Sequence, residues 1–161
     1  FVIALAGPSW HQIPTPVLKK EQALVVILDN SPMMLAQDIQ PSRIVRAKYK
    51  LIDVLKARQE GQTALVVFSA EPYVVTPLTQ DTQTLMNLLP AISPELMPES
   101  GQNVGLALSE AAQLIHQTGL AGGEILLITG GFAENDSVRN QLVDLKTQGI
   151  KTTIYGIGTA R

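Results

Sequence analysis

Side chains capable of metal or phosphate chemistry follow an apolar run near the start of the chain. Asp29 and Ser31 come directly after Leu24–Leu28, which reads LVVIL. A carboxylate followed by a hydroxyl at the end of a buried strand begins a metal- or phosphate-handling loop in several α/β folds. The same two residues also suit a turn in which their oxygens accept hydrogen bonds from loop amides. The residues alone leave both interpretations open.

Few other residues could take part in catalysis or metal binding. The histidines, His11 and His116, have no carboxylate at ligand spacing, so we expect surface or capping roles for them. The chain has no cysteine, which excludes disulfides, thiolate zinc sites and cysteine nucleophiles. No GxGxxG follows the first apolar run, and Walker and GxSxG motifs are absent. The sequence therefore predicts no catalytic residue and no cofactor. Arg43, Arg46 and Lys50 are expected to form a solvated helix face.

The composition is that of one globular domain. Of 161 residues, 45% are apolar and 16% charged, and the net charge is −2 without a basic stripe, which argues against nucleic-acid binding. The first residues, Phe1–Ala6 (FVIALA), are apolar but far too few to span a bilayer, which takes about 20. They suit either the end of a transmembrane helix or an ordinary first strand. We expect a membrane-proximal segment over residues 1–20 and the domain over residues 21–161.

Short apolar runs alternate with segments of helical periodicity. The runs lack polar alternation, as is typical of strands buried on both faces of a parallel sheet, and the run after Ser69–Pro72 is linked too closely for a crossover and should pair antiparallel. The predicted strands are Leu24–Leu28, Ala64–Phe68, Tyr73–Thr76, Ile125–Ile128 and Thr152–Ile157. The predicted helices are Arg43–Arg58, Thr82–Leu89, Val104–Gln117 and Ser137–Gln148, with Asn103 as an N-cap.

This alternation predicts a doubly wound α/β sheet with helices on both faces. In such a sheet the binding site lies beyond the carboxyl ends of the strands, where the strand order reverses. The segments expected to form it are Asp29–Met34, Ser69–Glu71, Ser100–Asn103 and Thr129–Glu134.

Several blocks, in order, carry a family resemblance. They are LVVILDNSPMMLAQDIQPSRIVRAKYKLIDVL, which contains DIQPSR at Asp38–Arg43, then ALVVFSAEPYVVTPLTQDT, LMPESGQNVGLAL, GGEILLITGG and GIKTTIYGIGT. Together they resemble the von Willebrand factor type A (vWA) domain, and more narrowly the BatA/BatB group of bacterial membrane-anchored vWA proteins. The resemblance covers nearly the whole chain. It implies the three-layer, doubly wound, Rossmann-like vWA fold, with a mostly parallel sheet and one antiparallel edge strand.

The resemblance also implies where a metal site would lie. In vWA domains a metal-ion-dependent adhesion site (MIDAS) holds magnesium or a similar cation, whose open position takes a carboxylate of a partner protein. Asp29 and Ser31 match the first Asp and the first Ser of its Asp-x-Ser-x-Ser motif. Three of five ligand positions differ: Met33 replaces the second Ser, Gln102, followed by Asn103, replaces the Thr, and Gly130 replaces the second Asp.

These replacements predict a degenerate MIDAS that binds no metal. A thioether is a soft ligand that suits magnesium poorly, and Gly130 removes a carboxylate. Gln102 offers a substitute oxygen only through its amide. A nearby carboxylate could restore binding by swinging in; the candidates are Asp38, Glu134 and Asp136.

We therefore expect a protein-interaction module and not an enzyme. The face beyond the carboxyl ends of its strands would bind a partner without metal. Met33, Met34 and Phe132 would make this face apolar. The resemblance implies a periplasmic domain anchored in the bacterial inner membrane by segments outside this chain. It also implies an aerotolerance or envelope-stress role with other vWA proteins, tetratricopeptide-repeat proteins and a MoxR-type ATPase.

Two alternative functions remain open. The first is a metal-dependent binder with a remodelled site, whose last ligand comes from the partner. The second is a small-molecule-binding α/β enzyme, which requires a deep polar pocket with convergent titratable groups.

Overall fold

Short runs of aliphatic residues form the strands of one sheet. The structure, a computed structural model, describes residues 23–58, 60–119, 122–133 and 135–158. Its strands are β1 (Ala23–Asp29), β2 (Gln62–Phe68), β3 (Pro72–Thr79), β4 (Gly123–Thr129) and β5 (Ile150–Gly156). They lie in the order β3-β2-β1-β4-β5, and only the edge strand β3 is antiparallel to its neighbour. The predicted mostly parallel sheet with one antiparallel edge strand is therefore confirmed.

The helices begin at residues that cap them. The side chains of Ser42, Asp81, Asn103 and Asn135 each accept a hydrogen bond from an amide in the first turn of the helix that follows. The α-helices are α1 (Arg43–Ala57), α2 (Thr82–Leu88), α3 (Val104–His116) and α4 (Asp136–Thr147). Short 3-10 helices are η3 (Pro32–Leu35), η4 (Leu89–Ala91) and η5 (Pro94–Leu96).

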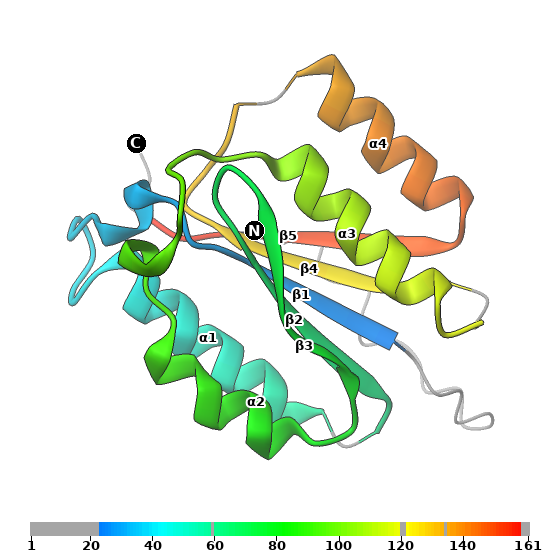
Figure 1. Ribbon diagram of the computed structural model, residues 1–161, viewed down its shortest axis with the longest axis horizontal. Coiled ribbons are helices and arrows are strands. Elements are labelled where there is room, and N and C mark those ends of the chain that lie inside the picture. Colours follow the sequence, from blue (N-terminus) through cyan, green and yellow to red (C-terminus); the bar gives the residue numbers. More distant parts are fainter. Residues whose placement is uncertain (1–22, 59, 120–121, 134, 159–161) are drawn as a thin grey trace.

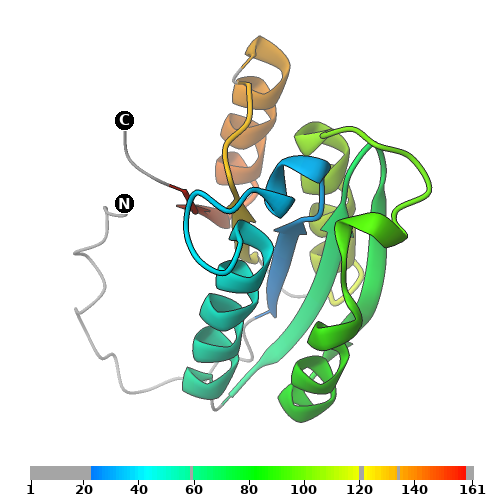
Figure 2. The ribbon, with the colours of Figure 1, turned by 90° about the vertical axis from the view of Figure 1, so that its left-hand side faces the viewer.

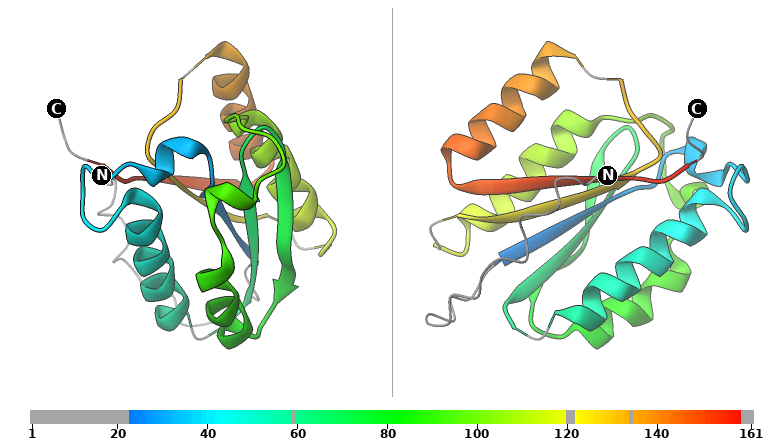
Figure 3. Two further views of the ribbon diagram at one scale, coloured as in Figure 1. Left: turned by 60° about the vertical axis from the view of Figure 1, so that its left-hand side comes forward. Right: turned by 180° about the vertical axis from the view of Figure 1, so that it is seen from behind.

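The sheet is the middle of three layers, with α3 and α4 on one face and α1 and α2 on the other (Figures 1 and 3). Successive side chains of β1 alternate between these two faces. Val25 and Ile27 pack toward α3 and α4, while Val26 and Leu28 pack toward α1 and α2. Every residue of β1 is buried, which explains its uninterrupted apolar sequence. The central strand therefore holds its last residue, Asp29, in a fixed place where the carboxyl ends of the parallel strands lie.

The basic face of α1 differs from the sequence-based prediction. Of the three residues expected on this face, only Arg46 is exposed; Arg43 lies against the loop after β4, and the Lys50 ammonium lies 4.9 Å from the centre of the Tyr155 ring. The expected solvated face was wrong for these two residues, because Arg43 packs against Gly130 and Gly158 and Lys50 lies over a ring of β5. On α3, His116 is exposed, as expected.

Some predictions concern residues that the structure does not describe. The proposed membrane-proximal segment, residues 1–20, lies outside the described residues, as do His11 and Glu134. Within the described part of the chain, every helix is too short or too polar to cross a bilayer.

The N-cap of α3 gives a first testable prediction. Asn103 Oδ1 accepts a hydrogen bond from the Leu106 amide at 3.1 Å. Asn103→Ala should lower the free energy of unfolding by about 1 kcal/mol, because that amide loses its partner. Urea denaturation followed by circular dichroism measures the loss. Asn103→Asp keeps the acceptor oxygen and should stay close to wild type; equal losses in both variants would contradict a capping role.

Candidate functional site

Three segments meet beyond the carboxyl ends of β1 and β4, the two strands between which the strand order reverses. They are the turn after β1, the loop before α3 and the loop after β4, and Figure 2 looks onto this side of the molecule. We call the surface that they form the strand-end face. Of the six residues that the sequence predicts for the site, Ser31 and Gln102 bond Asp29, Met33 contacts Gln102, and Gly130 lies in the loop after β4. The sixth, Asn103, follows Gln102 in the chain, but its side chain caps α3.

The carboxylate of Asp29 is the buried centre of this face. The residue is 0% exposed, and both oxygens accept hydrogen bonds. Oδ1 accepts from the Ser31 amide at 2.9 Å, and Oδ2 accepts from the Thr129 hydroxyl at 2.5 Å and from Gln102 Nε2 at 2.6 Å. A buried carboxylate is tolerated only where such donors replace water. Donors from three separate segments therefore satisfy Asp29.

Gln102 turns its amide nitrogen, and not its oxygen, toward the site. Nε2 donates to Asp29 Oδ2 and to the Gly131 carbonyl oxygen, each at 2.6 Å. The same nitrogen lies 3.2 Å from Met33 Sδ and 3.4 Å from Thr129 Oγ1. Because the atoms surrounding this nitrogen are hydrogen-bond acceptors, they favour the N–H group over the amide oxygen that Gln102 could offer to a cation.

The loop that carries Gln102 is held on both sides. The Asn103 amide donates to the Ser69 carbonyl oxygen at 2.7 Å, and Ser69 Oγ donates to the Glu99 carbonyl oxygen at 2.7 Å. A Cβ added to Gly101 would lie 2.9 Å from Ala70 Cα, so only glycine permits this close approach of the two loops. The backbone thus aims the Gln102 side chain at Asp29.

Arg43 fills the space beside Gly130. A Cβ at Gly130 would lie 2.8 Å from Arg43 Nη1 and 3.4 Å from Met34 Sδ. The guanidinium donates to both carboxylate oxygens of Asp38, at 2.8 and 2.9 Å, and Nη1 lies 3.5 Å from the Gly130 carbonyl oxygen. The hydrogen bonds to Asp38 raise the pKa of Arg43 above its ordinary value. The Arg43 guanidinium therefore occupies the space into which a carboxylate at position 130 would project.

Residues 30–34 divide between the interior and the surface. Asn30 is buried and its side-chain amide donates to the Ser93 carbonyl oxygen at 2.9 Å, which ties the segment around η5 to the site. Ser31 is also buried, and its Oγ has no hydrogen-bond partner among the described residues. Met33 is 38% exposed, whereas Met34 is fully buried against α1. The expectation that Met34 forms part of the binding face was wrong; it belongs to the core.

An apolar surface adjoins these residues. Met33 and Leu35 of η3 are 38% and 42% exposed, and Leu96 of η5 is 69% exposed. The helices η3 and η5 pack together, and we call their three exposed side chains the apolar rim. Phe132, expected on this face, is half-buried and packs against the core beneath α3 and α4.

The donors at the strand-end face do not fit a hard cation such as magnesium. Such ions take oxygen ligands, but here the Gln102 N–H group points inward beside a thioether. Within the described residues, no three His, Cys, Asp or Glu side chains converge on one point. Of the carboxylates that could restore a site, Asp38 is held by Arg43, and the Asp136 side chain is 95% exposed.

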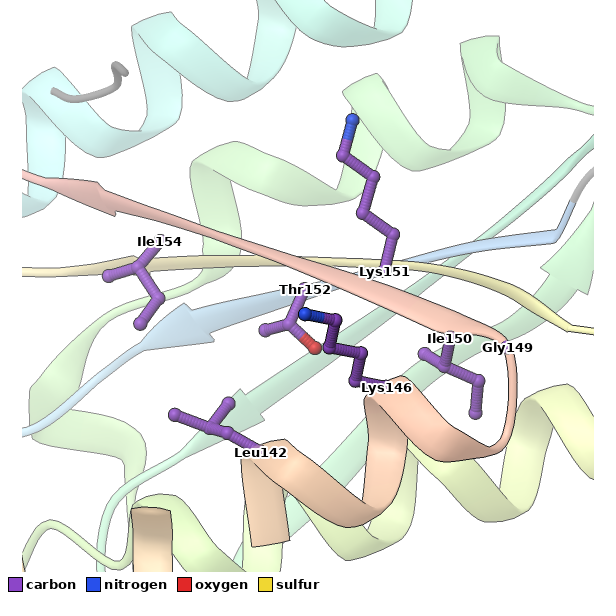
Figure 4. A pocket seen from close by; sticks show the side chains of 7 residues that line it. All are labelled: Leu142, Lys146, Gly149, Ile150, Lys151, Thr152 and Ile154. Atoms are coloured by element: carbon purple, nitrogen blue, oxygen red, sulfur yellow. The ribbon is translucent and has the colours of Figure 1, made fainter. Parts of the chain in front are cut away.

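A groove elsewhere on the molecule lies between α4 and the edge strand β5 (Figure 4). Its volume is about 570 Å³, and it is lined mainly by apolar atoms from Leu142, Ile150 and Ile154. Lys146 and Lys151 also line it, and its lining includes no acidic residue. This groove lacks the convergent titratable groups that the enzyme alternative requires.

Sequence reasoning missed some contributors to the site. Thr129 begins one of the segments expected to form the site, but no role is predicted for its side chain, whose hydroxyl donates to the Asp29 carboxylate. Its position as the last residue of a buried strand, next to Gly130, was a usable signal. Arg43 offered no such signal, because its contact with Gly130 joins residues 87 positions apart.

Comparisons with known proteins agree with this architecture. Residues 24–132 match the family model described as the von Willebrand factor type A domain. A protein of Borreliella burgdorferi is 28% identical over 160 residues, which are 98% of this chain and 46% of that protein. The chain therefore spans about half the length of this curated relative.

Two solved structures are similar over most of the chain. An aerotolerance-related membrane protein from Bacteroides fragilis is 28% identical with a TM-score of 0.79, over 85% of this chain and 68% of that one. BatB from Bacteroides thetaiotaomicron is 27% identical with a TM-score of 0.77, over 84% and 66%. From the family match, the sheet order and these structures, the chain belongs to the von Willebrand factor type A domain family, in which its near relatives are BatB-like.

Proposed function

We propose that this domain is a protein-interaction module whose strand-end face binds another protein without a metal ion. The observation that carries the proposal is the buried Asp29 carboxylate, whose hydrogen bonds come from Ser31, Gln102 and Thr129. With these donors in place, the carboxylate is not available to a cation that would bridge to a partner. The apolar rim of Met33, Leu35 and Leu96 offers the adjoining contact surface.

The relatives suggest the setting in which such a module works. One similar structure is described as an aerotolerance-related membrane protein, and another as BatB. We propose that this domain is likewise held at a membrane by segments outside the 161-residue chain, and faces the periplasm. Candidate partners are other vWA proteins, tetratricopeptide-repeat proteins and a MoxR-type ATPase. In this role the domain has no catalytic activity of its own.

A pull-down on the immobilised chain tests the interaction face. Met33→Lys places a charge in the apolar rim, and should weaken capture of the partner at least about tenfold, because desolvating the ammonium costs more than about 1.4 kcal/mol. The candidate partners are purified and offered singly to wild type and variant. Val143→Lys is the matched control, since Val143 is 56% exposed on α4, and should bind as wild type does.

The same assay in EDTA and in magnesium separates this proposal from a metal-dependent binder. Equal capture by wild type in both buffers supports metal-independent recognition. Capture that requires magnesium would contradict the proposal and favour a remodelled site completed by a ligand from the partner. Undiminished capture by Met33→Lys would place the interface away from the apolar rim.

A further inference from the structure

The surroundings of one nitrogen atom are unusual for a side-chain amide. Gln102 Nε2 has acceptor atoms of four residues within 3.4 Å: Asp29 Oδ2, Gly131 O, Met33 Sδ and Thr129 Oγ1. They belong to the turn after β1 and to the end of β4 with its following loop. The nitrogen thus lies at the point on which both segments direct their acceptors.

We propose that the Gln102 amide acts as a built-in substitute for the cation, joining the loops of the strand-end face by hydrogen bonds. This inference rests on the proposed function, because it explains how the binding face keeps its shape without metal. An amide group carries two hydrogens, and the two contacts at 2.6 Å account for both. The amide oxygen in the same place would face the oxygens of Asp29 and Gly131, so the acceptors determine the orientation.

Charge around the site favours an amide over an ion. The Arg43 guanidinium occupies the space beside Gly130, and its Nη1 faces the carbonyl oxygen of that residue. A divalent cation held at Asp29 would therefore meet one buried carboxylate, because Arg43, paired with Asp38, occupies the space of a second one at position 130. A neutral amide supplies N–H donors to the same acceptors and requires no second carboxylate. Asp29, Gln102 and Arg43 thus form one arrangement that is complete without metal.

The isosteric substitution Gln102→Glu tests this inference. It replaces the N–H donors by a second carboxylate beside buried Asp29, so the melting temperature in EDTA should fall below that of wild type. A saturating concentration of calcium, magnesium or manganese should then raise the melting temperature of this variant by roughly 5 °C or more. Wild type should show no such rise. Thermal unfolding of the 161-residue chain, with each metal alone, is the measurement.

Further variants keep the test decisive. Gln113→Glu adds the same charge at an exposed position of α3 and should show no cation response. Should Gln102→Glu fail to fold, Gln102→Met keeps the side-chain length without donors; it should melt below wild type and be insensitive to cations. A melting temperature of Gln102→Met equal to that of wild type, or a wild-type rise in cations matching that of Gln102→Glu, would overturn the inference. Because no partner is present, these outcomes are independent of the pull-down.

Discussion

Replacing Phe68 by alanine is expected to destabilise the domain by about 3–5 kcal/mol, the usual cost of emptying a buried phenylalanine site. Phe68 is 0% exposed and heads the fully buried side chains by volume. It packs between the sheet and α3, and its carbonyl oxygen accepts the Asn30 amide at 2.9 Å. Since domains are stable by only about 5–15 kcal/mol, much of the margin would be lost. Equilibrium unfolding in urea measures the difference.

A matched aromatic residue provides the control for Phe68. Tyr73 lies on the neighbouring strand β3, opposite Val67, and is 38% exposed. Tyr73→Ala removes a ring of similar size from a surface position, and should cost less than about 1 kcal/mol. If the two variants lose similar stability, the core between the sheet and α3 is less well packed than the structure indicates.

Asp29→Ala is expected to lower the free energy of unfolding by about 2–4 kcal/mol. The substitution leaves the Ser31 amide, the Gln102 amide and the Thr129 hydroxyl without their shared acceptor, and an unsatisfied buried donor costs about 1–3 kcal/mol. Water entering the space offsets part of the total. Urea denaturation in EDTA measures the loss without any contribution from cations.

Asp29→Asn separates the hydrogen bonds from the side-chain volume. It keeps one acceptor oxygen at nearly the same place and should recover roughly half of the stability lost in Asp29→Ala. A loss below about 1 kcal/mol in Asp29→Ala would mean that the carboxylate is not an organising centre, and that its donors find other partners.

Much of the fold follows from local sequence pattern. The run LVVIL predicts β1 because its residues pack alternately on two covered faces, and Asn103 predicts the start of α3 because its side chain caps the first turn. The close spacing after Phe68 predicts the antiparallel pairing of β3. In each case the signal and the structure lie within a few residues of each other.

The arrangement within the site was less predictable, because it depends on contacts between distant segments. The residue types at Asp29, Ser31, Met33 and Gly130 indicate that oxygen ligands are missing. They do not indicate that the Gln102 nitrogen points inward, since that orientation depends on acceptors of the β4 loop. Met33 and Met34 show the same limit: adjacent identical side chains have opposite environments because η3 turns one into the core.

The separation of the apolar rim from the packed interior has an evolutionary consequence. Met33, Leu35 and Leu96, which form the contact surface in the proposed function, lie outside both core clusters. Substitutions at these positions can therefore redirect the domain to a new binding target while the packed core stays unchanged. The same property suits the chain to laboratory diversification, with randomised codons confined to η3 and η5 over an unchanged scaffold.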